Sequence, residues 1–300
     1  MERLRLGGSA LEVSLVGLGC NNFGRRVDRA GTRAVVDAAL EAGVTFFDTA
    51  DIYGSGESER FLGAALTGRR ERAVVATKFG MELRGAGEGP RGSRAYARRA
   101  LEASLERLGM DHVDLLYYHR PDGVTPVAET LGAMQELLEE GKVGALGVSN
   151  VDAGQLAEAA VAAPVAAVQN HYSLLTRGDD AEVLPLCRER GIGFVPYFPL
   201  ESGLLTGKYR RGAPAPQGAR LAGDDDGRLS DERLARVEAL ETFAAERERS
   251  LLELAIGGLA SIPGISTVIA GATSVEQVQA NAEAGAWILT GDELEALEQL

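Results

Sequence analysis

One sequence pattern recurs along most of the chain. A helical stretch ends at a polar residue and a glycine, a short apolar segment follows, and polar residues come directly after it. A glycine just past a helix tolerates the left-handed conformation that ends it, and the β-branched and aromatic segments are typical of buried parallel strands. The pattern predicts eight strands, near residues 16–19, 45–48, 73–77, 113–118, 144–148, 165–169, 193–197 and 266–270.

The intervals between these strands have helical periodicity. Leu101, Leu105 and Leu108, for example, fall on one face of a helix. Strand–helix alternation repeated eight times favours a closed parallel barrel over an open sheet. A Rossmann fold is disfavoured, because no Gly-x-Gly-x-x-Gly opens a helix after a strand. The sequence therefore predicts an α/β fold, a (β/α)8 TIM barrel, as a single domain over residues 1–300.

Two segments lie outside the eight repeats. Leu4 to Val16, with a turn at Gly7-Gly8, predicts a β-hairpin that caps the barrel floor. Residues 198–230 contain several prolines and glycines, which predict a long irregular loop after strand seven. Long loops in compact domains tend to be functional. The acidic run Asp224–Asp226 in this loop is interpreted as solvated, and no metal site is expected.

Composition and cysteine spacing disfavour several classes of partner and of cellular location. The net charge of −13 disfavours nucleic acids and anionic membranes. No apolar run reaches the ~20 residues that span a bilayer, and the N-terminus lacks the apolar stretch of a secretory signal. Cys20 and Cys187 are far apart, which gives neither a disulfide framework nor metal-ligand spacing. These features predict a cytoplasmic protein.

Polar residues follow the predicted strands one after another. Barrel active sites lie at the carboxyl ends of strands. Taken singly, Asp48 could cap a turn, Lys78 could be solvated and His119 could be a satisfied core histidine. Together, from neighbouring loops, they predict a site. The residues at these ends are Asp48, Lys78, His119, Ser149, Asn150, Gln169 and Tyr197.

The same positions give the chain a family resemblance. In order from about Leu6 to Asn281, the sequence resembles the aldo-keto reductase superfamily. The spacing of five residues between Asp48 and Tyr53, followed by separate lysine and histidine motifs, is a specific signal. The matching stretches are Phe47–Gly54, Ala76–Gly80, Asp114–Asp122, Gly147–Asn150, Gln169-Asn170, Leu204–Tyr209 and Val268–Thr273.

The resemblance implies hydride transfer between a nicotinamide dinucleotide and a small carbonyl or alcohol substrate. Tyr53 would supply the proton as general acid. A free phenol has a pKa of ~10 and needs help near neutral pH. Lys78 would favour the phenolate, Asp48 would hold Lys78, and His119 would orient the carbonyl.

The resemblance also implies a cofactor site. Ser149, Asn150 and Gln169 would hold the nicotinamide amide, and Tyr197 would stack on the ring. A serine common in the family's loop after strand seven is replaced by Phe198. The remaining expected cofactor-binding residues are Gly19, Cys20, Asn21, Asp48, Tyr53, Pro199, Leu200, Gly203, Gly271, Thr273, Gln277 and Asn281.

Cofactor choice depends on the region after strand eight. Many family members place Lys or Arg there against the 2′-phosphate of NADP, whereas this chain has Gly271, Thr273, Ser274 and Gln277. Hydroxyls and a helix N-terminus also bind phosphate, although a guanidinium binds it more strongly. We expect NADP, with NAD as the alternative.

Two other readings remain open. Aldo-keto reductase folds also serve as channel-associated subunits that hold NADP, although no basic docking arm is visible and the four catalytic positions are intact. A barrel enzyme of another chemistry, such as an isomerase, would leave Ser149, Asn150, Gln169 and Tyr197 unexplained. Binding of NADPH separates the isomerase from the other two.

Overall fold

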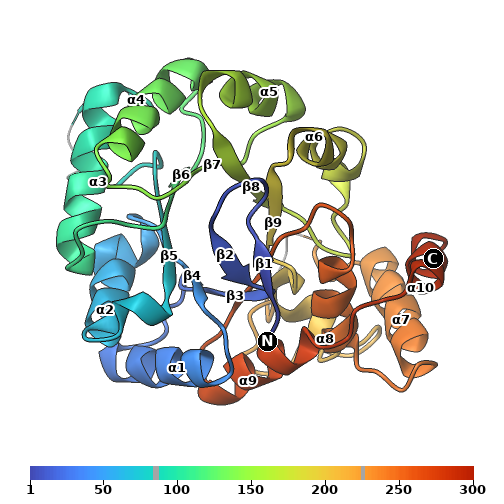
Figure 1. Cartoon of the computed structure of the whole chain (residues 1–300). Helices are drawn as coiled ribbons and strands as arrows, with labels where there is room; N and C mark the ends of the chain where they lie inside the picture. Colours follow the sequence, from blue (N-terminus) through green and yellow to red (C-terminus); the bar gives the residue numbers. More distant parts are fainter. Residues whose placement is uncertain (84–87, 224–226) are drawn as a thin grey trace.

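The computed structural model describes residues 1–83, 88–223 and 227–300 (Figure 1). Its central feature is an eight-stranded parallel sheet in the order β10-β3-β4-β5-β6-β7-β8-β9. Every strand predicted from the sequence is present, with ends within two residues of those expected. The strands are β3 (Val16–Gly19), β4 (Phe46–Asp48), β5 (Val74–Phe79), β6 (Leu115–Tyr118), β7 (Leu146–Ser149), β8 (Val165–His171), β9 (Gly193–Tyr197) and β10 (Val268–Gly271).

The sheet curls into a nearly closed barrel. The gap between β9 and β10 is bridged by the segment just before β10. There the Phe194 amide donates to the Gly264 carbonyl at 2.9 Å, and the Ser266 amide donates to the Phe194 carbonyl at 3.0 Å. The predicted TIM barrel is confirmed.

Helices surround the barrel in the ring seen in Figure 1. Most of them connect one strand to the next, as a βα repeat requires. They are α1 (Arg29–Glu41), α2 (Glu57–Leu66), α3 (Arg94–Leu108), α4 (Val127–Glu139), α5 (Ala153–Ala162), α6 (Val183–Arg190), α7 (Asp231–Ala245), α8 (Leu251–Glu253), α9 (Val275–Ala284) and α10 (Gly291–Glu298). A π-helical turn, Leu254–Gly258, continues α8.

Side chains from the strands fill the barrel interior. Tyr117 belongs to this inner core, whereas its neighbour Tyr118 packs in the outer layer and stacks on Phe79 with ring centroids 5.5 Å apart. Strand alternation predicts these opposite faces, and the structure confirms it. Gly147 makes room for Tyr117, since a Cβ at residue 147 would lie 2.4 Å from the ring. The packed interior leaves the active site at the barrel mouth.

The predicted hairpin closes the opposite end. β1 (Arg3–Arg5) pairs with β2 (Glu12–Ser14) in an antiparallel ribbon. At its turn, Gly7 has a φ of +56°, and a Cβ there would lie 2.6 Å from the Gly191 carbonyl oxygen. Leu6 of the hairpin is completely buried in the inner core. The hairpin therefore caps the barrel floor, as predicted.

The segment between β9 and α7 is the long loop predicted after strand seven. Among its described residues, a 3-10 turn, Glu201–Thr206, is the helical element, and the others form turns and irregular backbone. The acidic run Asp224–Asp226 lies outside the described residues. In the part of the chain that the structure describes, no helix has the length and apolar character needed to cross a membrane.

Candidate active site

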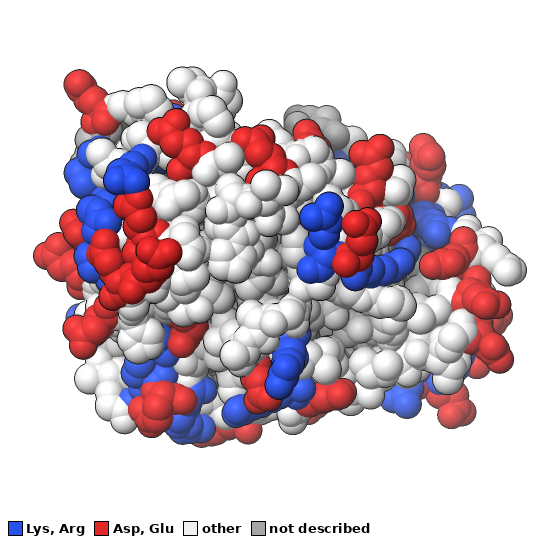
Figure 2. All heavy atoms as spheres, turned by 45° about the horizontal axis from the view of Figure 1, so that its top comes forward, with Lys and Arg blue, Asp and Glu red and all other residues white. Residues whose placement is uncertain are grey.

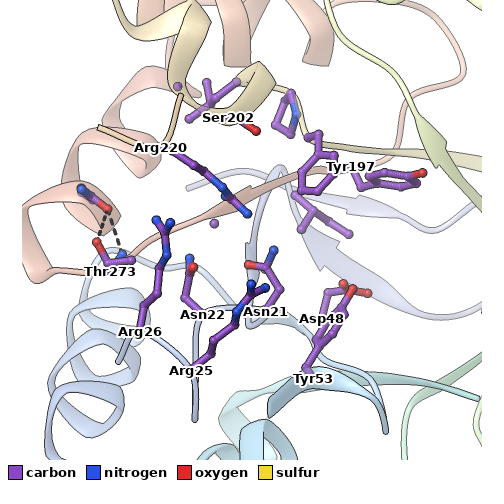
Figure 3. A pocket seen from close by; sticks show the side chains of 18 of the residues that line it. Asn21, Asn22, Arg25, Arg26, Asp48, Tyr53, Tyr197, Ser202, Arg220 and Thr273 are labelled. Atoms are coloured by element: carbon purple, nitrogen blue, oxygen red, sulfur yellow. Dashed lines mark hydrogen bonds between the residues drawn. The ribbon is translucent and has the colours of Figure 1, made fainter. Parts of the chain in front are cut away.

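A pocket of about 1220 Å³ opens at the carboxyl ends of the barrel strands. It is lined by the loops that follow β3, β4, β5, β6, β7, β9 and β10, and Figure 3 shows side chains from several of these loops pointing into it. This is the end of the barrel at which such enzymes place their chemistry. Residues from separate sequence motifs thus line one continuous space.

A buried ion pair lies behind Tyr53. The Lys78 ammonium is completely buried and donates to Asp48 Oδ2 at 2.5 Å and to the Thr49 carbonyl at 2.9 Å. Its third contact is the Tyr53 hydroxyl, at 3.3 Å. Asp48 is held in turn by Gln169, whose Nε2 donates to Oδ1 at 2.9 Å. The lysine is therefore fixed between a carboxylate and the phenol that faces the pocket.

The charges around Tyr53 act in opposite directions. Burial raises the pKa of Tyr53, and the positive charge of Lys78 opposes that rise. Burial would lower the pKa of Lys78, but the Asp48 carboxylate and the Tyr53 hydroxyl reverse the effect and raise it. At neutral pH the Tyr53 phenol thus keeps its proton, and the Lys78 ammonium lies beside it. That arrangement suits a group that gives up a proton only during a reaction.

His119 completes the reacting end of the pocket. Its amide donates to the Phe79 carbonyl at 2.7 Å, which fixes the backbone, and its ring meets the Tyr53 ring edge-on with centroids 5.9 Å apart. Burial lowers the pKa of His119 well below its usual value, and the charges of Lys78 and Arg120 add to the effect. The ring is therefore neutral, and a neutral imidazole has one N–H to donate.

A tight turn presents Tyr53 to the pocket. Tyr53 begins a 3-10 turn, Tyr53–Gly56, in which Gly54, Ser55 and Gly56 all have positive φ. Gly56 packs against α3, because a Cβ there would lie 2.7 Å from the Arg107 side chain. Glycines at two of these positions remove most of the cost of this backbone. The spacing of five residues between Asp48 and Tyr53 thus spans a strand end and one compact turn.

Amide side chains line the pocket wall next to Tyr53 and His119. Asn150, which has a φ of +56°, donates to the His119 carbonyl at 2.9 Å and accepts from the Tyr197 hydroxyl at 2.7 Å. Its Nδ2 also lies 3.0 Å from Ser149 Oγ. The structure brings Ser149, Asn150, Gln169 and Tyr197 together at the ends of three neighbouring strands. Ser149 itself is buried and does not line the pocket.

The loop after β9 has a strained start. Phe198, Glu201 and Ser202 all have positive φ, which is costly for residues with a side chain. The buried carboxylate of Glu201 offsets this backbone strain by accepting four hydrogen bonds. Glu201 Oε1 accepts from Ser173 at 2.6 Å, Thr176 at 2.8 Å and His171 at 2.9 Å, and Oε2 accepts from Arg233 at 3.0 Å.

His171 links this carboxylate to the pocket wall. Its ring stacks on Tyr197 with centroids 5.5 Å apart and planes at 17°. Burial would raise the pKa of Glu201, but the hydrogen bonds from His171, Ser173 and Thr176 lower it to about 2. Glu201 is therefore ionised and ties the strained turn to the stacked pair. Sequence reasoning missed it, since its donors come from distant segments.

The far end of the pocket lies beside β10 and α9. Gln277 Oε1 accepts from the Thr273 amide at 2.8 Å and from its hydroxyl at 3.1 Å, the pair of dashed lines in Figure 3. Nearly all the expected cofactor residues line the pocket: Gly19, Asn21, Asp48, Tyr53, Asn150, Gln169, Tyr197, Phe198, Pro199, Leu200, Gly203, Gly271, Thr273, Gln277 and Asn281. Cys20 does not. Its thiol is buried, and its amide and carbonyl bind Asp48 and Ser58.

Basic side chains also gather at this end. Arg25 and Arg26 come from the loop after β3, and Lys208 and Arg220 come from the loop after β9. Figure 3 shows Arg26 and Arg220 reaching into the pocket from opposite sides. Burial lowers the pKa of Arg220, and the charges of Arg26 and Arg25 lower it further. Sequence reasoning looked for cations only after strand eight. No local spacing connects Arg26 to Arg220, and only Arg220 lies in the loop that the sequence marked as long and irregular.

The family profile described as the aldo/keto reductase family matches residues 15–300. The chain belongs to the aldo/keto reductase family. Family and fold support an oxidoreductase, and aldo-keto reductases use nicotinamide cofactors.

Individual relatives differ in what they are named for. The chain is 38% identical to a probable voltage-gated potassium channel subunit beta from Oryza sativa subsp. japonica, over 95% of this chain and 91% of that protein. It resembles the holo form of an aldo-keto reductase from Bacillus halodurans, with a TM-score of 0.85, 32% identity, and coverage of 100% and 96% of the two chains. A glycerol dehydrogenase from Gluconobacter oxydans gives a TM-score of 0.86 and 28% identity, with 99% and 94% covered.

Proposed function

We propose that this chain is an NADP(H)-dependent reductase of aldehydes, ketones or sugars that also runs the reverse oxidation. The observation that carries the proposal is the buried Lys78–Asp48 pair directly behind the Tyr53 hydroxyl, which opens on the same pocket as His119. A nicotinamide cofactor, when bound, supplies or accepts the hydride. The chain's own task is to bind the carbonyl and move a proton to its oxygen.

Tyr53 is the general acid in this proposal. It donates its proton to the carbonyl oxygen as negative charge develops there. Lys78 stabilises the phenolate left behind, and Asp48 keeps Lys78 charged and aimed at Tyr53. His119 donates its single ring N–H to the carbonyl oxygen and orients it. In the oxidation of an alcohol, Tyr53 takes the proton back.

The pocket fits a dinucleotide along its length. The amide groups of Asn150 and Gln169 suit the carboxamide, and the Tyr197 ring suits stacking against the nicotinamide. At the other end, the charges of Arg26, Lys208 and Arg220 suit phosphates. NADP carries one more phosphate than NAD, so this basic end supports NADP as the preferred form.

A second candidate is a cofactor-binding subunit with little turnover. It is favoured by the 38% identity to the protein named as a probable potassium channel subunit. The arrangement of Tyr53, Lys78, Asp48 and His119 argues for turnover, because a protein that only binds a cofactor has no need for a tuned proton donor.

Turnover separates these candidates. The purified protein would be assayed for loss of NADPH and NADH absorbance with a panel of aldehydes, ketones and sugars. We expect reduction of at least one class, with NADPH preferred. NADPH binding, seen by fluorescence quenching, without turnover of any carbonyl would support the subunit. Failure to bind either cofactor would contradict both candidates and would favour a barrel enzyme of another chemistry, such as an isomerase.

We also propose that residues 1–300 act as one domain in the cytoplasm. Both cysteines, Cys20 and Cys187, are buried free thiols, which agrees with a reducing compartment. A single calorimetric transition would support one domain, and two separate transitions would contradict it.

A further inference from the structure

Arg120 directly follows His119 and lines the same pocket. Its side chain is exposed, and no hydrogen bond or ion pair to it is found among the described residues. A guanidinium is always charged and offers five donors in a planar fork. An arginine in this state at a reacting centre can bind an anion.

Arg120 follows His119 and therefore lies at the Tyr53–His119 end of the pocket, which is the reacting end in the proposed function. Burial lowers the pKa of His119, and Arg120 contributes to that decrease. Burial raises the pKa of Tyr197, and Arg120 opposes the increase. Arg120 comes from the loop after β6, whereas the basic cluster suited to cofactor phosphates comes from the loops after β3 and β9.

Many arginines elsewhere on the chain are paired with acidic residues. On the face viewed in Figure 2, Lys and Arg side chains lie among Asp and Glu side chains. Arg98 on α3, for example, donates to Glu140, the C-cap of α4, at 2.6 and 2.9 Å. With 44 acidic against 31 basic residues, such partners are abundant. Arg120 has no such acidic partner among the described residues.

Nothing in the described lining of the pocket neutralises Arg120. Asp48 is the acidic residue among the described lining residues, and its carboxylate is already shared by Lys78 and Gln169. The neighbouring surface at this end includes the apolar side chains of Ile52 and Met81. A ligand here meets a proton donor, a short apolar wall and one free positive charge.

We propose that Arg120 binds an anionic group of the substrate, so that the preferred substrates are aldehydes or ketones that carry a carboxylate or a phosphate. This inference rests on the proposed reductase function. Arg120 acts as a specificity-determining residue: it holds the anion while Tyr53 and His119 address the carbonyl. A planar fork recognises a carboxylate or phosphate through two parallel hydrogen bonds.

The test compares each anionic substrate with a neutral counterpart. One set is 3- and 4-carboxybenzaldehyde with their methyl esters, which differ in charge but little in shape. The other pair is glyceraldehyde 3-phosphate and glyceraldehyde. We expect kcat/KM for the preferred acid to exceed that of its ester by about tenfold, as one charge-assisted contact at an exposed site implies. Raising the ionic strength should narrow the difference.

Variants assign the effect to one residue. Arg120→Gln should lower kcat/KM for the anionic substrates about tenfold, mainly through KM, and change the esters less than twofold. Arg120→Lys should retain part of the preference. Arg190→Gln, at the end of α6, is the matched control and should change nothing. Arg220→Gln should raise the KM for NADPH without altering the acid-to-ester ratio.

The outcomes are distinct. An acid-to-ester ratio near one for every pair, or an equal loss of acid and ester activity in Arg120→Gln, overturns the anion site. If no carbonyl is turned over, the reductase proposal fails instead. Calorimetric titration of benzoate into the NADPH-loaded protein then decides the anion site. Binding that Arg120→Gln abolishes supports it, and absence of binding overturns it.

Discussion

At the reacting end of the pocket, the two charged groups behind Tyr53, Lys78 and Asp48, are strand residues that pair with each other. At the far end the charged groups are loop residues with no carboxylate against them among the described residues. Lys78 and Asp48 are both buried and bonded to each other. Arg26 and Arg220 reach toward the same space from two loops. The first arrangement is complete without a ligand, whereas the second brings like charges together.

This difference separates two tasks. A proton donor works best when the groups around it are fixed before the reaction, since nothing then has to reorganise as charge develops. A phosphate-binding end gains instead from positive charges that a ligand neutralises, because binding relieves their repulsion. We therefore expect substitutions at the reacting end to act on turnover and those at the loop end to act on cofactor affinity.

The largest expected effect is at Tyr53. Tyr53→Phe keeps the ring and removes the hydroxyl, so turnover should fall by roughly 10²–10⁴. NADPH affinity, measured by fluorescence quenching, should barely change. Tyr96→Phe makes the same chemical change outside the pocket and serves as the control. Near-normal turnover in purified Tyr53→Phe would remove Tyr53 from its role.

The next effects test the order of roles behind Tyr53. Lys78→Met removes the buried charge that would stabilise the phenolate, and turnover should fall almost as far as in Tyr53→Phe. Asp48→Asn should cost less, because Asp48 acts through Lys78. Both variants disturb a buried ion pair, so thermal unfolding must be compared with kcat. If Asp48→Asn were the more damaging change at equal stability, the proposed order would be wrong.

Much of this reacting end follows from sequence alone. A strand carries its last residue to the barrel mouth, so the residues at the ends of β4, β5 and β6 converge wherever the barrel forms. Asp48, Lys78 and His119 sit at such ends, and Tyr53 follows within one turn. Regular strand spacing thus fixes where these side chains lie.

The positions of the charged residues at the loop end cannot be predicted from the sequence in this way. Arg220 is ten residues before Ser230, the N-cap of α7, in a segment without periodicity. Its approach to Arg26 depends on how the loop folds over the barrel. Glu201 is similar, since its donors come from β8, the segment after it and α7. Contacts between loops have no sequence period to reveal them.

A substitution at Glu201 tests the loop end of the pocket, and its expected effect is smaller than those at Tyr53 and Lys78. Glu201→Gln should weaken NADPH binding by about tenfold, because the strained turn and Tyr197 lose their anchor. The kcat at saturating cofactor should change less than threefold. Glu238→Gln, an exposed change on α7, is the control. A loss of kcat with unchanged NADPH affinity would place Glu201 with the reacting end instead.

The pH dependence of stability gives an independent readout of the same residue. The pKa of Glu201 is lowered to about 2 in the fold, below its value in an unfolded chain. The carboxylate therefore stabilises the protein above pH ~4.5 and loses that contribution as the pH falls toward 2. The difference in unfolding free energy between the wild type and Glu201→Gln should be constant from pH 8 to 6 and shrink below pH ~4.5. A difference that does not change with pH would mean that the charge of Glu201 is irrelevant.

The smallest expected effect concerns cofactor choice at Gln277. In the structure, Gln277 Oε1 occupies both donors of Thr273. Gln277→Arg frees those donors and adds a guanidinium, and both changes favour a 2′-phosphate. Repulsion from Arg26 and Arg220 opposes the gain, so we expect NADPH to bind only about threefold to tenfold more tightly, or about 1 kcal/mol. NADH, which lacks the phosphate, should be nearly unchanged. Gln277→Met frees the Thr273 donors without adding charge and separates the two contributions.

The measurement is a titration of NADPH and NADH against the wild type, Gln277→Arg and Gln277→Met at one ionic strength. Equal tightening of NADPH and NADH, or of neither, would show that the 2′-phosphate does not sit beside residue 277.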